Sequence, residues 1–142
     1  MKKLTTIEVT LDEGAFMPQR AHAEDAGLDI FSREDVVIPA RGAHVFNTGV
    51  HFSIPAGYVG LIKSKSGLNV KHGLQTEGVI DAGYTGAIIT KVYNHSDVDY
   101  TVRRGDKITQ LVIIPVETPV PILVDGLDKT DRGEGGFGST GR

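Results

Sequence analysis

Short runs of alternating or β-branched apolar residues, separated by glycine and proline, cover most of the chain. The runs are Leu4–Leu11, Asp35–Ile38, His44–Ile54, Tyr58–Lys63, Gly86–Tyr93, Tyr100–Val102 and Ile108–Val116. Alternation with a period of two is typical of strands that bury one face. Turn sequences such as Pro39-Ala-Arg-Gly42 and Pro55-Ala-Gly57 stand between these runs. The pattern therefore predicts an all-β fold, a barrel or sandwich of many short strands.

One helix and one domain complete this outline. The helix is expected over Ser66–His72, where Gly73 ends it. No repeat or linker divides the chain, so residues 1–124 are predicted to form a single β domain. Pro119 and Pro121 interrupt the last apolar run, and the polar, glycine-rich residues 125–142 are predicted to be a flexible arm.

Composition narrows the class of protein. The chain has 142 residues, a net charge of −3 and no cysteine. Disulfides, thiolate metal sites and cysteine nucleophiles are thereby excluded. A small negative charge argues against non-specific binding to nucleic acid or to anionic membranes. We find no signal peptide and no apolar run long enough to span a membrane, so a soluble cytoplasmic protein is expected.

The end of the chain carries the groups that a phosphate site needs. Between Arg132 and Arg142, five glycines accompany Ser139, Thr140 and Phe137. Glycine lets backbone N–H groups approach an anion closely, the arginines and hydroxyls bind phosphate, and the phenyl ring offers a face for a base. The alternative is a disordered tail without a function. We favour an arm that becomes ordered over a nucleotide.

Two other segments offer candidate chemistry. Gly78–Gly86 reads as a hairpin, with Asp81 placed to activate water and Tyr84 placed to pack against a sugar. The alternative is an aspartate that stabilises a turn beside a core tyrosine. Lys63–Leu68 brings two lysines and two serines to a short helical turn, which suits an anion but also describes a solvated turn.

The remaining candidates are weaker. The acids of Asp25–Phe31 could serve a metal or cap a turn, and Gln110 is a lone amide in an apolar strand. Arg104-Gly-Asp106 matches the tripeptide that cell-adhesion receptors bind, although a hairpin turn explains it better. The histidines show no metal-ligand spacing.

Taken together, these segments resemble the homotrimeric dUTPase family across nearly the whole chain. The five motifs of that family occur in order: Ala26-Gly-Leu-Asp29-Ile; Lys65-Ser-Gly-Leu68; Gly78-Val-Ile-Asp81 through Tyr84 and Gly86; Arg104-Gly-Asp-Lys-Ile-Thr-Gln110-Leu; and Arg132-Gly-Glu-Gly-Gly-Phe137-Gly-Ser-Thr-Gly141. The resemblance implies a jelly-roll-like β fold and a trimer with three sites at subunit interfaces. One subunit of that family donates its arm to a neighbour's pocket.

The reaction that the resemblance implies is hydrolysis of dUTP to dUMP and pyrophosphate with Mg²⁺. This keeps uracil out of DNA and supplies dUMP for dTMP synthesis. Asp81 would deprotonate the attacking water, and Asp29 would lie near the metal through water. The other residues that it implies bind the substrate: Lys65, Ser66, Gly67 and Gln110 at the α- and β-phosphates, Arg132, Gly138, Ser139 and Thr140 in the arm that clamps the γ-phosphate, and Phe137 stacked on uracil.

Specificity would follow from shape and from hydrogen bonding. The resemblance implies that Tyr84 lies against the deoxyribose and excludes a 2′-hydroxyl, while backbone groups at Gly78 and Ile89 read the uracil edge. The chain departs from the family pattern twice. Lys65 stands where arginine is usual, which loses bidentate geometry but keeps the charge, and Gly83 replaces an acid before the tyrosine. The role of Gln75 stays open.

Two alternatives remain at this point. A dCTP deaminase-like enzyme of the same fold would need a glutamate base near the hairpin, and Glu77 is the nearby candidate, although it does not fit the deaminase pattern. A phage or mobile-element regulator would act by binding another protein. The intact set of Asp81, Tyr84, Gln110 and the arm favours the hydrolase.

Overall fold

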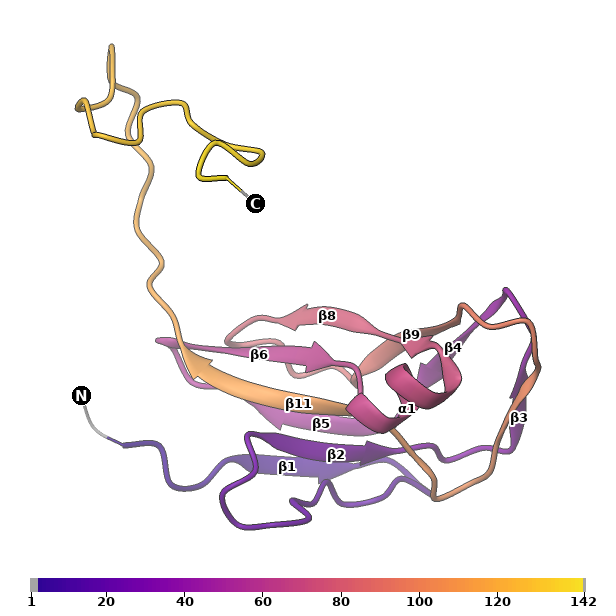
Figure 1. Ribbon diagram of the computed structural model, residues 1–142. Helices are drawn as coiled ribbons and strands as arrows, with labels where there is room; N and C mark the ends of the chain where they lie inside the picture. The colour runs from indigo at the N-terminus through magenta and orange to yellow at the C-terminus, as the bar shows by residue number, and fades with distance from the viewer. Residues whose placement is uncertain (1–2, 142) are drawn as a thin grey trace.

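The computed structural model describes residues 3–141, in which short strands and one short helix form an all-β body with an extended C-terminal segment (Figure 1). The elements are β1 (Glu8–Leu11), β2 (Gly27–Phe31), β3 (Val36–Ile38), β4 (Ala43–Asn47), β5 (Val50–Ser53), β6 (Tyr58–Lys63), α1 (Ser66–His72), β7 (Leu74–Gln75), β8 (Glu77–Ile80), β9 (Ile89–Asn94), β10 (Tyr100–Val102) and β11 (Lys107–Pro115). The all-β prediction is confirmed.

The strands pair in four small antiparallel sheets. The largest has the order β2-β11-β6-β8, and a second has the order β4-β9-β7. The pairs β1-β5 and β3-β10 make up the other two. Strands distant in sequence lie side by side, as β2 does against β11, which is the connectivity of a jelly-roll-like fold.

Two apolar clusters fill the interior. The first joins β2, β5, β6 and β11 and consists of Ile30, Val50, Phe52, Ile54, Ile62, Ile88 and Leu111. The second joins β3, β4, β7, β9, β10 and β11 and consists of Ile38, Phe46, Leu74, Val92, Val102 and Ile108. Strand β11 contributes to both, and its length of nine residues allows it to run from one cluster to the other.

The longest predicted strand is divided in the structure. The run His44–Ile54 becomes β4 and β5, which belong to different sheets. Gly49 has a φ of 69° and lies between them. This left-handed conformation is open to glycine without a steric penalty, so the chain turns there and leaves one sheet for the next.

The prediction of a hairpin at Gly78–Gly86 is wrong in one respect: the turn is present, but the two strands that flank it do not pair with each other. Strand β8 pairs with β6, whereas β9 pairs with β4 and β7. The two strands that flank the turn therefore belong to different sheets and present unpaired backbone edges to each other. Their separation matters for the candidate site.

The adhesion-like tripeptide lies in a turn, as expected. The Asp106 backbone N–H donates to the Arg103 carbonyl at 2.9 Å, and the Asp106 side chain accepts from the Arg103 N–H at 2.9 Å. Gly105 has a φ of 92°. The sequence Arg104-Gly-Asp106 thus serves the connection between β10 and β11.

Beyond β11 the chain leaves the body. The Val116 N–H still bonds the Gly57 carbonyl at 2.9 Å, and no helix or strand follows among the described residues up to Gly141. The segment stands away from the sheets in Figure 1. In the described part of the chain, no helix is long and apolar enough to cross a membrane.

Candidate functional site

The turn after β8 carries the proposed base. Asp81 follows the last residue of β8, and its side chain is exposed. The Tyr84 N–H donates to the Asp81 carbonyl at 3.1 Å, and Gly83 has a φ of 85°. Such a φ favours glycine, so Gly83 fits the conformation that this turn requires.

Tyr84 folds back over its own turn. Its hydroxyl donates to the Ala87 carbonyl at 2.8 Å, and the side chain is 44% exposed. A Cβ added to Gly86 would lie 2.4 Å from the Tyr84 hydroxyl oxygen. Glycine at this position is therefore what allows the ring to lie there.

A small cavity opens beside this turn, in the gap between β8 and β9. It has a volume of about 150 Å³ and is lined by Val79, Ile80, Asp81, Tyr84, Ala87 and Ile89. Both walls offer unpaired backbone: β8 is an edge strand, and Ile89–Val92 pair only with β4. A flat polar ring inserted here would meet peptide donors and acceptors on its edge.

A larger hollow continues along the same strands. It measures about 530 Å³ and is lined by Gln75, Thr76, Glu77, Gly78, Val79, Tyr93 and His95. The Gln75 side-chain oxygen lies 2.9 Å from His95 Nε2, so this amide already has a partner within the chain.

A second group of candidate residues lies on the row that crosses β2, β11 and β6. Asp29 faces Gln110 in the β2-β11 pair, and Gln110 faces Lys63 in the β11-β6 pair. Gln110 Nε2 donates to the Ser64 carbonyl at 2.9 Å. A Cβ at Gly27 would lie 2.1 Å from Gln110 Oε1, so Gly27 provides the space for the amide.

Asp29 is buried between two lysines. Its side chain is 4% exposed, and its oxygens lie 2.5 Å from Lys65 Nζ and 3.2 Å from Lys107 Nζ. Burial of a carboxylate is tolerated when it is paired in this way. Lys107 could not be predicted as a partner of Asp29 from the sequence, because its approach depends on the β2-β11 pairing. Ser66 and Gly67 open α1 beside Lys65, and both are exposed.

The described residues offer no protein cage for a metal. No group of three or more His, Asp or Glu side chains among them could hold an ion. Magnesium usually retains several waters and is bound through one or two carboxylates together with substrate phosphates. The side chains present fit an ion that arrives on a triphosphate, with the exposed carboxylate of Asp81 and the paired carboxylate of Asp29 as the acidic groups.

One chain does not bring the two groups together. In the β6-β8 ladder Ile80 faces Gly60, at the opposite end from Lys63, which faces Glu77. Asp81 and Tyr84 therefore lie at one end of β6, whereas Ser64, Lys65 and Ser66 follow its other end. At a rise of about 3.3 Å per residue, the two groups are separated by roughly 13 Å along the strand.

The arm residues do not dock on their own body. The hydrogen bonds of the described arm residues are local, as from Arg132 Nε to the Gly135 carbonyl at 2.7 Å and from the Ser139 N–H to the Gly136 carbonyl at 3.2 Å. Phe137 is fully exposed and has a φ of 48°. The segment presents its ring, hydroxyls and guanidinium to whatever lies opposite.

Comparison with known proteins assigns the family. The family model named dUTPase matches residues 13–141. The chain belongs to the dUTPase family. This agrees with the resemblance carried by the five motifs.

Curated relatives match this chain over most of their length. The chain is 48% identical over 139 residues to the deoxyuridine 5′-triphosphate nucleotidohydrolase of Eremothecium gossypii, covering 96% of this chain and 91% of that protein. It is 45% identical over 132 residues to the rice protein of the same name, covering 92% and 77%.

Solved structures of this family agree in fold. The dUTPase of Staphylococcus bacteriophage 80alpha, solved with dUPNHPP, superposes with a TM-score of 0.92 at 37% identity, covering 98% of this chain and all of that one. The dUTPase of phage phi11 of S. aureus, described with a structural Mg(II) ion, has a TM-score of 0.81 at 36% identity, covering 88% of this chain and all of that one. The jelly-roll-like prediction is thereby confirmed.

Proposed function

We propose that this chain hydrolyses dUTP to dUMP and pyrophosphate. The family, the curated names of its relatives and the dUTP analogue bound by the 80alpha enzyme support the substrate. The structural observation that carries the proposal is the cavity between β8 and β9, which has Asp81 and Tyr84 at its rim. These matches favour hydrolysis over deamination of dCTP.

Uracil would enter the gap between the two strands. Backbone groups at Gly78 and Ile89 lie on edges that are not used by a ladder across the gap, so they are free to read the donor and acceptor pattern of the base. A base with the wrong pattern would leave buried polar groups unpaired, which is strongly disfavoured. The Tyr84 ring, held by its bond to Ala87, would lie against the deoxyribose and exclude a 2′-hydroxyl.

The reaction would be an attack of water on the α-phosphorus. The Asp81 carboxylate would orient this water and accept its proton, while the bond from the α-phosphorus to the bridging oxygen breaks and pyrophosphate leaves. Ser66, Gly67 and Lys65 would hold the α- and β-phosphates, with Lys65 exchanging Asp29 for a phosphate oxygen. Gln110, fixed over Gly27, would orient the α-phosphate.

The arm would complete the site when substrate is bound. Arg132, Ser139 and Thr140 would clamp the γ-phosphate with the backbone of Gly138, and Phe137 would stack on uracil. A fully exposed phenyl ring on an undocked segment supports this role, because such a ring gains burial only when the arm closes.

Magnesium belongs to the proposal as an ion carried by the triphosphate. It would neutralise phosphate charge and so make the α-phosphorus easier to attack. Asp29 would lie near it through water, and the lysines beside Asp29 would balance the charge of the phosphates.

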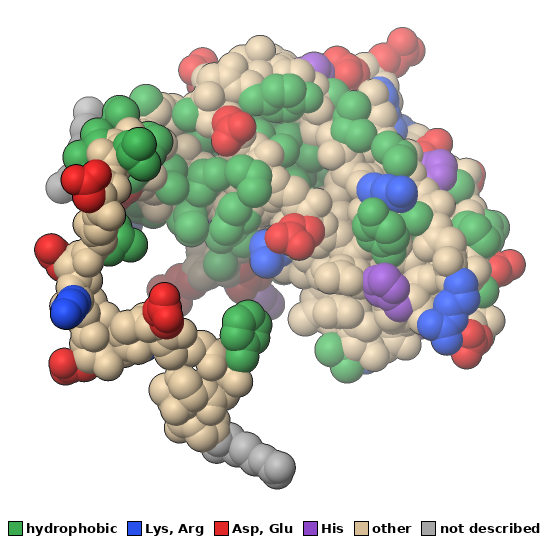
Figure 2. Space-filling view, turned by 90° about the horizontal axis from the view of Figure 1, so that it is seen from above, with side chains coloured by type: hydrophobic (Ala, Val, Ile, Leu, Met, Phe, Trp, Pro, Cys, Tyr) green, Lys and Arg blue, Asp and Glu red, His purple; other side chains and the backbone are tan. Residues whose placement is uncertain are grey.

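We further propose a homotrimer, because the two halves of the site lie at opposite ends of one chain. A turn carrying Asp81 from one subunit would meet Ser66 and Gln110 of another. Exposed apolar residues on β4, β8 and β9, namely Val45, Val79, Ile89 and Tyr93, could be buried between subunits. Figure 2 shows apolar side chains gathered over the face of the body that lies toward the arm.

The deciding experiment measures pyrophosphate release with Mg²⁺ from dUTP, dTTP, dCTP and UTP, with ammonia from dCTP measured in parallel. Selective turnover of dUTP supports the proposal. Ammonia from dCTP would establish the deaminase alternative instead. If neither product forms, the hydrolase proposal fails and a binding role replaces it.

A further inference from the structure

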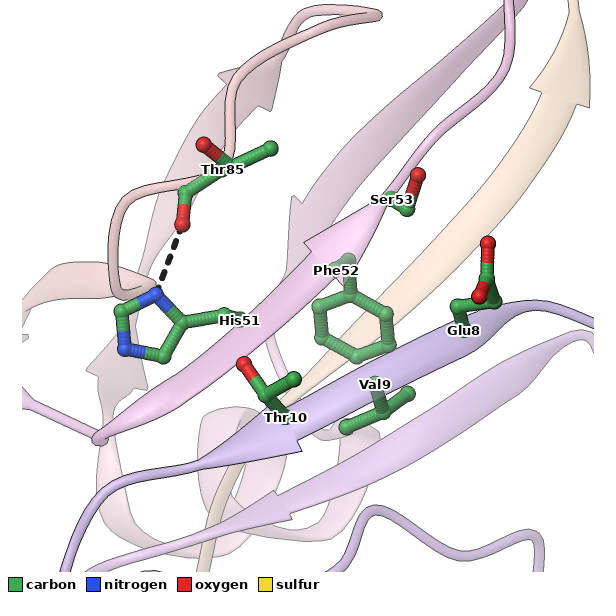
Figure 3. Close-up of a pocket in the computed structure, with 7 residues that line it drawn as sticks. All are labelled: Glu8, Val9, Thr10, His51, Phe52, Ser53 and Thr85. Atoms are coloured by element: carbon green, nitrogen blue, oxygen red, sulfur yellow. Dashed lines mark hydrogen bonds between the residues drawn. The ribbon is translucent and has the colours of Figure 1, made fainter.

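His51 connects three parts of the chain beside the turn that carries Asp81 and Tyr84. It lies on β5, and its Nδ1 is 2.7 Å from the Thr85 carbonyl oxygen. Its Nε2 is 3.0 Å from Asp12 Oδ1, in the segment after β1. Figure 3 shows the imidazole pointing toward Thr85 at the edge of a hollow of about 290 Å³, which is lined by residues of the paired strands β1 and β5 and by Thr85.

Both partners of this imidazole are acceptors. A carbonyl oxygen cannot donate, and an ionised carboxylate cannot donate either. Neutral histidine has one N–H and can satisfy one of them, whereas the imidazolium has two and can satisfy both. The geometry is therefore complete only when His51 is protonated.

The bond to Thr85 restrains the turn from outside. Within the turn, the Tyr84 N–H bonds the Asp81 carbonyl, and the Tyr84 hydroxyl bonds the Ala87 carbonyl. These bonds shape the turn but do not attach it to the body. Two contacts provide that attachment. The Gly83 N–H donates to the Ile54 carbonyl at 3.2 Å, and His51 contacts the Thr85 carbonyl. His51 lies on β5, and Ile54 is the residue after β5.

We propose that His51 is a positioning residue whose protonated ring fixes the Asp81–Thr85 turn to β5 and to the segment after β1. The proposal rests on the function proposed above, because that function assigns catalysis to Asp81 and sugar binding to Tyr84, both on this turn. His51 touches neither group directly and acts through the Thr85 carbonyl.

The charged surroundings determine how this device depends on pH. The Thr85 carbonyl and, next, the Asp12 carboxylate raise the pKa of His51 above its ordinary value of 6.5, while partial burial and, to a smaller extent, Arg33 lower it. Glu8 on β1 lines the same hollow, and Asp81 lies on the restrained turn. The side chain of His51 is 25% exposed, so it can exchange protons with water.

The direction of the pH dependence follows from the raised pKa of His51. The two bonds are fully present below pH 6.5, the ordinary value, and one of them is lost as the pH rises through the pKa of the folded protein. The turn should therefore become less restrained as the pH rises through that pKa. An aspartate of ordinary pKa is already ionised at pH 6.5, so a general base of this type alone gives no descending limb above that pH.

The first measurement is an NMR titration of the full-length protein without substrate. We expect the amide shifts of Gly83, Tyr84 and Gly86 to change with the same midpoint as the His51 ring, and Asp12→Asn to lower that midpoint. Amide shifts of the turn that do not change with the His51 titration would overturn the proposal. This measurement does not depend on turnover, so it remains decisive if dUTP is not hydrolysed and the proposed function fails.

The second measurement is the pH profile of kcat/KM for dUTP. For the wild type we expect a decline of about fivefold above the His51 midpoint, corresponding to one hydrogen bond. His51→Gln should lie near the lower plateau at every pH and show no such limb. The matched control is His44→Gln. His44 lies on β4 and pairs with Glu34 rather than with the Asp81–Thr85 turn, so this variant should keep the wild-type profile. A limb that persists in His51→Gln would contradict the assignment.

Discussion

Two glycines provide the space in which the proposed site's side chains lie. Tyr84 rests where a Cβ of Gly86 would be, and the Gln110 amide rests where a Cβ of Gly27 would be. Both glycines occur in the family motifs, and neither has a polar side chain that could act on a substrate. Their contribution is geometric, because each holds a neighbouring group in one orientation.

Asp81→Asn should lower kcat for dUTP by a factor of roughly 10²–10⁴, the range that a general base contributes. The amide keeps the size of the carboxylate but cannot accept the proton. Because Asp81 is exposed, the melting temperature should stay the same, and dUTP should still bind. Single-turnover kinetics and isothermal titration measure the two effects, and substantial turnover by the variant would remove Asp81 from the role of base.

Tyr84→Ala should admit UTP, reducing the preference for dUTP over UTP in kcat/KM by about tenfold or more, because the wall against the sugar is lost. Tyr84→Phe is the matched control. It removes the hydroxyl that bonds the Ala87 carbonyl but retains the ring, so discrimination should largely survive. Equal discrimination in all three proteins would place the 2′-hydroxyl filter elsewhere.

At the scale of elements, the sequence predicted local structure better than sheet membership. Tyr58–Lys63, Ser66–His72 and Tyr100–Val102 were predicted with the bounds that the structure has. The run His44–Ile54 was predicted as one strand because its buried alternation, at Phe46, Thr48, Val50 and Phe52, continues through the turn at Gly49. Periodicity reports which face is buried, and it does not report which strand lies alongside.

The same limit applied to the candidate site. The turn at Asp81–Tyr84 was predicted from glycine spacing, but a hairpin was expected where the structure has an open gap between two sheets. Neither the ion pair of Asp29 with Lys107 nor the contact of His51 with Thr85 could be predicted, since each joins segments distant in sequence.

The packing of β2 on β11 can be tested through Gly27→Ala. The new Cβ cannot coexist with the Gln110 amide, so the side chain should rotate away and lose its bond to the Ser64 carbonyl. We expect kcat to fall about as far as in Gln110→Ala. The double variant should be no worse than either single one, because both remove the same interaction. Additive losses in this double-mutant cycle would show that Gly27 acts independently of Gln110.

At the scale of the whole molecule, the fold keeps Asp81 and Gln110 apart, although the proposed reaction needs both at one substrate. The rigid sheet β2-β11-β6-β8 holds Asp81 and Gln110 apart, and no rotation of a side chain spans the length of β6. The extended arm, as far as it is described to Gly141, stands away from the body that it leaves (Figure 1). The proposed symmetric assembly would resolve both features, because every copy would offer each half of the site to a neighbour.

Mixing two inactive variants tests this arrangement directly. Asp81→Asn and Gln110→Ala each inactivate one half of the site, and co-expression in equal amounts should restore activity. If the halves come from different chains, about one quarter of the sites in randomly mixed trimers carry both intact residues. If both halves come from one chain, no mixture contains an intact site and activity stays at the level of the parent variants. Mixtures of each variant with wild type calibrate subunit exchange, and sedimentation measures the size of the assembly. Trimers that exchange subunits without regaining dUTP turnover would show that the site does not combine Asp81 and Gln110 from different chains.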